Sequence, residues 1–118
     1  MAVPEPPDGF IPMIKIATDF SPVPSGRYRT DGPDSGERFR EEFLIPALEG
    51  GGKLIVDIDG TEGYQTSFLE EAFGGLIWNK VIDKADLLNR LEIINKDPDY
   101  AIYRDLIWTF IKDAPTAK

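Results

Sequence analysis

The sequence predicts a small α/β protein built around a parallel or mixed sheet. The first observation is the apolar, β-branched run at residues 53–58, which follows three glycines and ends at Asp59 and Gly60. Such a run is typical of a central strand with both faces covered. The second observation is that helical patterns alternate with short strand-like runs along the chain, as in α/β layer proteins. The length of 118 residues suffices for one core. We expect a flexible arm at residues 1–12, a single domain at 13–113 and a tail at 114–118.

The residues before the central strand predict one strand and one helix. Residues 13–17 alternate enough for a half-buried strand that ends before the next prolines, and residues 24–29 fit either a second short strand or an ordered loop. Asp34, three residues before Glu37, predicts a capping pair at the start of a helix whose apolar face runs to Leu48. Pro46 has no N–H, so this helix must kink there or restart as a last turn.

A second helix is predicted to follow the central strand. Ser67 and Glu70 fit a capping box, so we expect this helix to begin at about Ser67. Its apolar residues form one stripe of a 3.6-residue period: Phe68, Leu69, Ala72, Phe73 and Leu76. Glycines cost about 1 kcal/mol each inside a helix, so Gly74 and Gly75 predict close packing against a neighbouring element.

The C-terminal third predicts a short helix, a last strand and a final helix. Residues 81–82 fit either an edge segment or a connection, and Asp83 is expected to cap a helix at 85–90. The run at 91–94 is expected to be the last strand. Asp97 and Pro98 then fit an N-cap and the first position of the final helix, whose apolar stripe extends to Ile111.

Composition excludes several classes of function. The chain has 13 Lys and Arg against 21 Asp and Glu, a net charge of −8, so we expect neither nucleic acid nor an anionic membrane as a partner. It has no cysteine and no histidine, which excludes disulfides, thiolate nucleophiles, Cys-based zinc sites and His-based catalysis. No secretion-type leader and no apolar run near membrane-spanning length occur in the sequence, so we expect a soluble, cytoplasmic protein.

The central strand carries a motif with an enzymatic interpretation. Residues 55–61 match the h-h-D-x-D-G-T nucleophile motif of the haloacid dehalogenase phosphatases. That resemblance implies a magnesium-dependent phosphatase with Asp57 as nucleophile and Asp59 as general acid. Lys80 and Lys84 follow, but no apolar strand ending in an acidic pair does. The other interpretation is that both aspartates make hydrogen bonds at the strand end and turn.

A second resemblance covers most of the chain. The sequence segments that carry it are Ser25–Tyr28, Asp31-Gly32, Ser35–Glu37 with Phe39-Arg40, Gly63-Tyr64 and Ser67–Leu76. Together they resemble the bacterial STAS-like domain family of unknown function, which is similar to the STAS domains of anti-sigma factor antagonists. The resemblance implies a small STAS-like mixed sheet with helices packed mainly on one face, and a non-enzymatic regulatory role in signalling without a cofactor or a metal.

The same resemblance implies a phosphoacceptor at the start of the second helix. In the antagonists a GHKL-type ATPase kinase phosphorylates a hydroxyl in a D-S-S/T-G element; here Gln65-Thr66-Ser67-Phe68 occupies that place. Ser67 and Thr66 are therefore the candidates. Gln65 replaces the acidic residue and Phe68 the glycine. The alternative for Ser67 is a plain N-cap.

We expect the partner to be a protein, either a GHKL-type ATPase or kinase or another signalling component. Its expected contacts are Gly26, Arg27, Ser35, Arg38, Asp59, Gly63, Tyr64, Gln65, Glu70 and Glu71. A phosphate on Ser67 would be opposed by nearby glutamates and favoured by the helix N-terminus. Arg27, Arg29 or Arg38 would offset that repulsion if the loop before the first helix lies beside the site. A third possibility is a stand-alone oligomerising domain.

Overall fold

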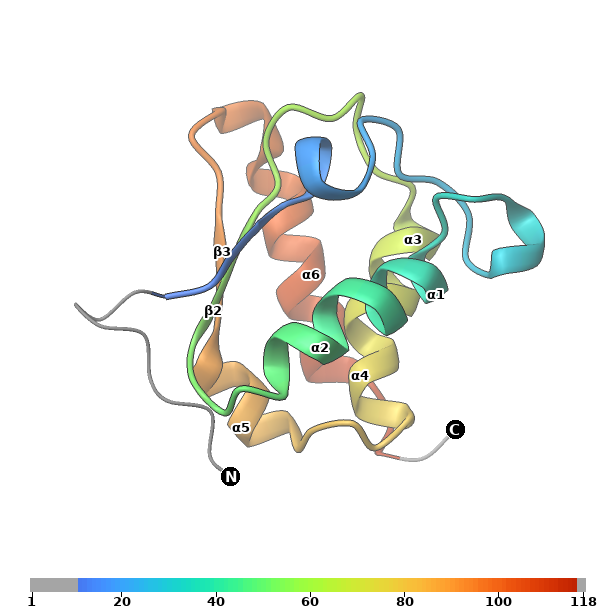
Figure 1. Cartoon of the computed structure of the whole chain (residues 1–118). Coiled ribbons are helices and arrows are strands. Elements are labelled where there is room, and N and C mark those ends of the chain that lie inside the picture. The colour runs from blue at the N-terminus through green and yellow to red at the C-terminus, as the bar shows by residue number, and fades with distance from the viewer. Residues whose placement is uncertain (1–10, 117–118) are drawn as a thin grey trace.

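The computed structural model describes residues 11–116 and confirms an α/β fold (Figure 1). Three strands form one sheet in the order β1 (Met13–Lys15), β2 (Leu54–Asp57) and β3 (Leu91–Ile94). β2 pairs in parallel with both neighbours. The described strands are thus all parallel, and an antiparallel strand of the expected mixed sheet is not among them.

The helices lie on one face of this sheet (Figure 1). Leu54, Val56 and Ile58 point to that face and are fully buried. Ile55 and Asp57 alternate with them and stay partly exposed on the opposite face. The expectation that helices mainly cover one face is confirmed. The expectation that both faces of the central strand are covered is wrong for the described residues, because each crossover between sequential strands returns over the same side.

The first long helix runs from residue 36 to residue 48. It consists of α1 (Gly36–Phe39), a π-helical segment (Arg40–Leu44) and α2 (Ile45–Leu48). Its N-cap is Ser35, whose hydroxyl accepts from the Arg38 N–H at 3.2 Å. The prediction of Asp34 as the cap is wrong, because the Asp34 carboxylate instead accepts from the Ser21 hydroxyl at 2.9 Å. The helix does not restart at Pro46, because Leu44 and Ile45 are both in helical geometry and the π-helical segment runs directly into α2.

The second long helix runs from residue 66 to residue 78. It consists of α3 (Thr66–Leu69), a π-helical segment (Glu70–Gly74) and α4 (Gly75–Trp78). Gln65 occupies the N-cap position, so the prediction of a Ser67–Glu70 capping box is wrong. The physical reason is tertiary: the Glu70 carboxylate binds Arg27 and is not available to the helix start.

The second helix is buried between its neighbours, as its two glycines predict. It packs against both the first long helix and α6 (Ala101–Asp113). A Cβ on Gly74 would lie 3.5 Å from the Phe110 carbonyl oxygen of α6, and a Cβ on Gly75 would lie 2.3 Å from Arg40 Nη1. At residue 75 an added side chain would overlap the Arg40 guanidinium of the first long helix. At residue 74 the distance to α6 is an ordinary contact, and the overlap would be with the Trp78 ring of the same helix, at 2.8 Å.

The remaining elements largely follow the sequence predictions. α5 (Lys84–Arg90) precedes β3, and residues 81–82 form the connection before it. The Asp97 side chain caps a 3₁₀ turn (Pro98–Tyr100) that leads into α6, as predicted. A π-helical turn (Ile16–Phe20) follows β1. Residues 24–29 are an ordered loop, followed by a 3₁₀ turn (Arg29–Asp31).

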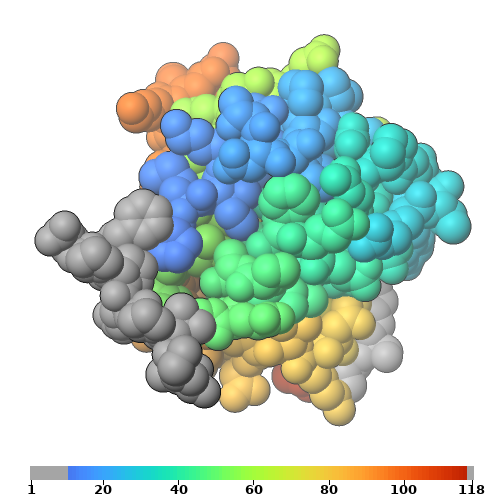
Figure 2. Space-filling view, viewed as in Figure 1, coloured from blue at the N-terminus to red at the C-terminus, as the bar shows by residue number. Residues whose placement is uncertain are grey.

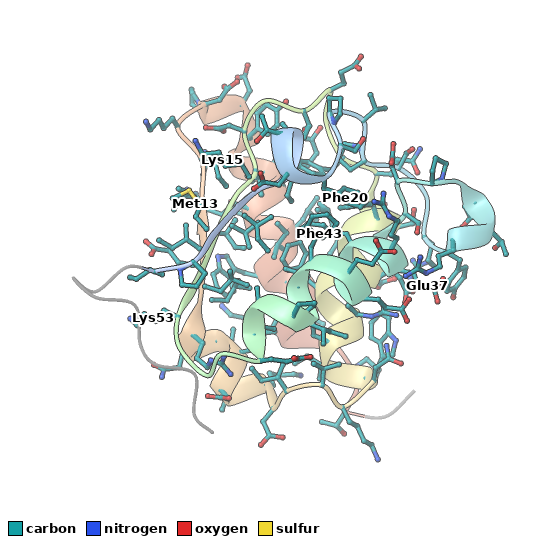
Figure 3. All side chains as sticks on the ribbon, viewed as in Figure 1. Met13, Lys15, Phe20, Glu37, Phe43 and Lys53 are labelled. Atoms are coloured by element: carbon teal, nitrogen blue, oxygen red, sulfur yellow. The ribbon has the colours of Figure 1, made fainter. Side chains whose placement is uncertain are left out.

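An aromatic layer fills the space between the β1 turn and the two long helices. Phe20 and Phe43 point into this layer (Figure 3), and their ring centroids lie 5.3 Å apart. Phe39 and Phe68 are fully buried beside them. The layer fixes the β1 turn and the following loop relative to the second helix.

Both ends of the described chain are attached to the domain. The Pro12 carbonyl accepts from the Ile55 N–H at 3.0 Å, and the buried Ala114 accepts from Lys84 at 2.8 Å. The rest of the predicted arm, residues 1–10, and residues 117–118 lie outside the described residues. Within residues 11–116, no helix combines the length and the apolar character needed to cross a membrane.

Candidate functional site

Two segments that are far apart in the sequence form the candidate surface. We define the loop–helix surface as residues 26–38 together with residues 59–71. The Glu62 N–H donates to the Pro22 carbonyl at 2.8 Å, and the Gly26 N–H donates to the Gln65 side-chain oxygen at 2.9 Å. The Gly36 backbone also approaches the Phe68 carbonyl so closely that an added Cβ would lie 2.4 Å from it. The structure thus places the two predicted halves of the binding surface side by side.

Gln65 joins the two halves at the helix start. It is exposed, has extended backbone geometry at the N-cap and makes no capping hydrogen bond. Its amide oxygen instead accepts from Gly26, whose φ of +92° suits a glycine. The anti-sigma factor antagonists that the sequence resembles have an acidic residue at this position. In this chain Gln65 instead holds the 26–38 loop against the start of the second helix.

Arg27 makes the shortest side-chain contact between the two halves of the surface. Its guanidinium lies 2.6 Å from Glu70 Oε1 and 3.3 Å from Glu71 Oε1. Burial alone would lower the pKa of Arg27, but its hydrogen bonds and charge interactions with both glutamates raise the pKa above its ordinary value. Arg27 is therefore a fixed cation at the second helix, where it offsets part of the local negative charge.

A buried ion pair lies beneath this exposed one. Arg40 Nη1 lies 2.7 Å from Glu71 Oε2 and also donates to the Glu71 carbonyl at 2.7 Å. The two residues belong to the two π-helical segments, one in each long helix. Glu71 thus links Arg27 on the surface to Arg40 in the interior, and the loop is connected to the helix crossing.

The other two candidate arginines are directed elsewhere. Arg29 pairs with Glu41 and Glu42, each at 2.9 Å. Arg38 pairs with Glu42 at 3.3 Å, and its guanidinium lies over the Phe20 ring at 4.9 Å. Hydrogen bonds from Arg29 lower the pKa of Glu42. Arg27 is therefore the one of the three predicted arginines that is ion-paired to the second helix.

Three predicted contact residues are buried and act within the fold. Ser35 caps the first helix, and Glu71 holds Arg40. The Tyr64 hydroxyl donates to the Ile58 carbonyl at 2.8 Å, and its ring packs edge-on against Tyr103 at 5.2 Å. Burial raises the pKa of the Tyr64 phenol. Partner contact stays a prediction for the more accessible members, Gly26, Arg27, Arg38, Asp59, Gly63, Gln65 and Glu70.

Both candidate phosphoacceptors are accessible in the first turn of the second helix. Thr66 is exposed and Ser67 is partly exposed. Residues three and four positions apart lie on the same face of a helix, so Ser67 shares its face with Glu70 and Glu71, the two partners of Arg27. Thr66 shares its face with Glu70 alone. A group attached to Ser67 would therefore lie nearer the Arg27 contacts.

Comparison with known proteins identifies the family. A model of the STAS-like domain of unknown function matches residues 35–101, which is more than half of the chain. The chain belongs to this STAS-like family. No curated protein and no solved structure matches it.

The STAS-like match covers the second half of the loop–helix surface completely. It begins at Ser35, the N-cap of the first helix, and ends at Ala101, the first residue of α6. β2, the second helix and β3 all lie inside it, whereas β1 and residues 26–34 lie outside it. Arg27 therefore joins a segment outside the family match to a helix inside it.

In this STAS-like domain the phosphatase-like motif makes structural hydrogen bonds. Asp57 Oδ1 accepts from the Asp59 N–H at 3.0 Å, and Asp59 Oδ2 accepts from the Lys96 N–H at 2.6 Å. Both aspartates therefore make the strand-end hydrogen bonds of the second interpretation. Among the residues that the structure describes, no three acidic side chains gather as a group that could hold a metal ion.

The STAS-like domain also has a cavity that the sequence did not suggest. Its volume is about 590 Å³, and it lies between the C-terminal ends of the two long helices and α5. Its lining combines apolar side chains such as Ile45 and Ile77 with charged ones such as Glu49, Asp83 and Asp86. Lys84 donates to two carbonyls at the end of α6, and Arg90 donates to Leu48 and Gly52, so both cations already bind backbone oxygens. No short sequence pattern marks such a cavity, because its walls come from distant segments.

Proposed function

We propose that this STAS-like domain is a non-enzymatic regulatory module that binds another protein through the loop–helix surface. The observation that carries the proposal is the Arg27 contact with Glu70 and Glu71, which holds the 26–38 loop against the start of the second helix. Such a contact gives the surface a defined shape and a mixed charge. Preorganised surfaces of this kind lose little conformational entropy when a partner binds.

The proposed partner is a GHKL-type ATPase or kinase, and the proposed control is phosphorylation at Ser67 or Thr66. The family resemblance supplies the partner class, and the accessible hydroxyls in the first helical turn are compatible with it. This role would place the protein in the cytoplasm, where ATP is available to the kinase.

A phosphate at this position would compete with Glu70 for Arg27. It adds about −1.5 to −2 charges and three strong acceptor oxygens at neutral pH. Arginine binds phosphate through two parallel hydrogen bonds, so Arg27 would move from Glu70 towards a phosphorylated Ser67 one turn earlier. The released Glu70 and the new phosphate would both add negative charge to the surface, which changes the affinity for the partner.

The test combines binding with phosphate mapping. The purified chain is titrated with the GHKL-type kinase encoded nearest to its gene, with and without ATP, and phosphate is located by mass spectrometry. We expect binding that is weakened by Arg27→Glu and Gln65→Ala. The matched control Lys112→Glu, on the exposed end of α6 and outside the loop–helix surface, should leave binding unchanged.

Three results would count against the proposal. Absence of binding, or binding that ignores the Arg27 and Gln65 variants, would remove the loop–helix surface as the site. Absence of phosphate from Ser67 and Thr66 after incubation with a kinase that binds would remove the switch alone. Magnesium-dependent hydrolysis of a generic phosphoester that disappears in Asp57→Asn would show an enzyme and remove the non-enzymatic role.

A further inference from the structure

The cavity at the C-terminal ends of the two long helices is not used by the proposed function. It lies at the amino ends of the strands, because α2 ends shortly before β2 and α5 leads directly into β3 (Figure 1). The loop–helix surface lies at the opposite end of the sheet, since its two segments follow the carboxyl ends of β1 and β2. Figure 2 shows the segments that border the cavity, residues 45–49 and 77–86, beside each other towards the lower edge of the molecule. A ligand in this cavity would therefore leave the loop–helix surface free.

The cavity has the size of a small-ligand site and a partly apolar lining. Its volume of about 590 Å³ falls within the range of about 300–1,000 Å³ that is typical of such sites. Leu48 and Ile77 are 5% and 3% exposed, and Ile45 also contributes to the lining. Apolar side chains of this kind favour the hydrocarbon part of a ligand. The charged side chains then decide which polar group the ligand carries.

Two of the three cations in the lining already bind the chain itself. Lys84 Nζ donates to two backbone carbonyls at the end of α6, at 2.7 and 2.8 Å. Arg90 donates to two backbone carbonyls at and after the end of α2, at 2.6 and 2.8 Å, and lies 3.4 Å from Asp86. The third cation, Lys80, is exposed. Lys84 and Arg90 are therefore poorly available to an anionic ligand.

Two carboxylates of the lining have no cation of their own. Glu49 and Asp83 make no ion pair with any residue that the structure describes. Asp83 occupies the N-cap position of α5, but its side chain makes no capping hydrogen bond. Glu49 is the C-cap residue of α2, where the helix macrodipole disfavours an anion. Both carboxylates are thus available to a bound cation, which would also relieve the unfavourable position of Glu49.

We propose that the cavity binds an organic cation with an apolar body, such as a primary alkylamine in its ammonium form. The hydrocarbon part would lie against Ile45 and Ile77, and the ammonium group would pair with Glu49 and Asp83. The C-terminal ends of the two long helices add partial negative charge at the same place. Lys80 would compete with the ligand for the carboxylates, because it carries the same charge. The inference does not depend on the proposed protein-binding function, since the two sites share no residue.

The experiment titrates the full chain with hexylammonium, hexanoate and hexanol, which share a hydrocarbon chain and differ in charge. Methyl NMR signals of Ile45 and Ile77 report binding in the cavity, and the signal of the exposed Ile102, outside the lining, reports nonspecific contact. We expect the cavity signals to shift at the lowest concentration with hexylammonium. Glu49→Gln and Asp83→Asn should each weaken its binding about threefold, as for a solvated charge pair. Hexanol binding should stay unchanged in both variants.

Two further variants separate the effect of charge from an effect on folding. Lys80→Asn should strengthen hexylammonium binding about twofold, because it removes a solvated competing cation. Lys80 has a φ of +59°, and asparagine tolerates this left-handed backbone. The matched control Glu92→Gln, at an exposed carboxylate on β3 outside the lining, should have no effect. Circular dichroism of each variant checks that the fold is unchanged.

Four results would overturn the proposal. Absence of shifts at Ile45 and Ile77 with every probe would exclude the cavity as a binding site. Equal shifts at Ile102 would show that the contact is nonspecific. Binding of hexanoate or hexanol as tight as that of hexylammonium would exclude a cation as the preferred ligand. A preference for hexylammonium that persists in the combined Glu49→Gln and Asp83→Asn variant would show that these carboxylates do not select the charge.

Discussion

Arg40 and Glu71 form a buried ion pair at the crossing of the two long helices. Their closest atoms lie 2.7 Å apart, and the two residues are only 5% and 4% exposed. Each lies in a π-helical segment, a feature that often marks functional positions. A Cβ on Gly75 would contact the Arg40 guanidinium, so the pair and the glycine occupy the crossing together. The crossing therefore depends on a charge pair as well as on apolar packing.

Breaking this pair should strongly destabilise the fold. Glu71→Gln leaves the Arg40 charge buried and without its anion, which typically costs about 3–5 kcal/mol. Urea unfolding followed by circular dichroism measures the loss. The combined Arg40→Met and Glu71→Met variant should recover much of the stability, because a buried pair can be replaced by apolar side chains of similar volume. A single variant with wild-type stability would contradict the assignment.

Gly36→Ala should destabilise the contact between the two long helices. An added Cβ would lie 2.4 Å from the Phe68 carbonyl oxygen, and backbone atoms cannot move aside as a flexible side chain can. Overpacking of this kind costs about 1–3 kcal/mol. The control is Gly52→Ala, where no atom lies within 4 Å of the added Cβ. Thermal unfolding should show a lower midpoint for Gly36→Ala than for the control.

Stability should fall in alkaline solution because of Tyr64. Burial raises the folded-state pKa of this phenol above its unfolded value of about 10. The unfolded chain therefore loses the proton first as the pH rises, and the free energy of unfolding decreases above about pH 10. Urea unfolding on both sides of that pH measures the slope. Tyr64→Phe should reduce the slope, whereas Tyr28→Phe, at a side chain that is 47% exposed, should not.

Gln65→Ala should loosen the 26–38 loop without unfolding the domain. It removes the acceptor of the Gly26 N–H, a hydrogen bond typically worth about 0.5–1.5 kcal/mol. Hydrogen exchange should accelerate at the Gly26 amide and remain unchanged in β2. Thr66→Ala, at the next exposed position, is the matched control. Equal exchange at Gly26 in both variants would show that Gln65 does not hold the loop.

The central part of the fold could be predicted from local sequence. β2 and β3 were predicted because short apolar runs between turn residues have few other interpretations. The packing role of Gly74 and Gly75 followed from the cost of glycine inside a helix. The helix starts were less predictable. Asp34 and Ser35 can both act as caps, and the choice depends on Ser21, which lies 13 residues away from Asp34.

The arrangement of the candidate site depended on tertiary contacts that no local pattern contains. Glu70 was expected to cap its own helix, but Arg27, 43 residues earlier in the chain, binds it. The sequence could indicate that arginines and glutamates occur in both segments, and it could not select Arg27 over Arg29 or Arg38. The sequence allowed Tyr64 to be either a packed side chain or a partner contact, and the structure shows that it is buried.

The order of the sheet has a consequence for synthesis on the ribosome. Each strand pairs with the strand that precedes or follows it in the chain, and a single crossover separates them. The nascent polypeptide can therefore add one strand and its helix at a time, without waiting for a distant segment to return. β2 is the common partner of both edge strands, so its emergence is the step that permits cotranslational assembly to begin.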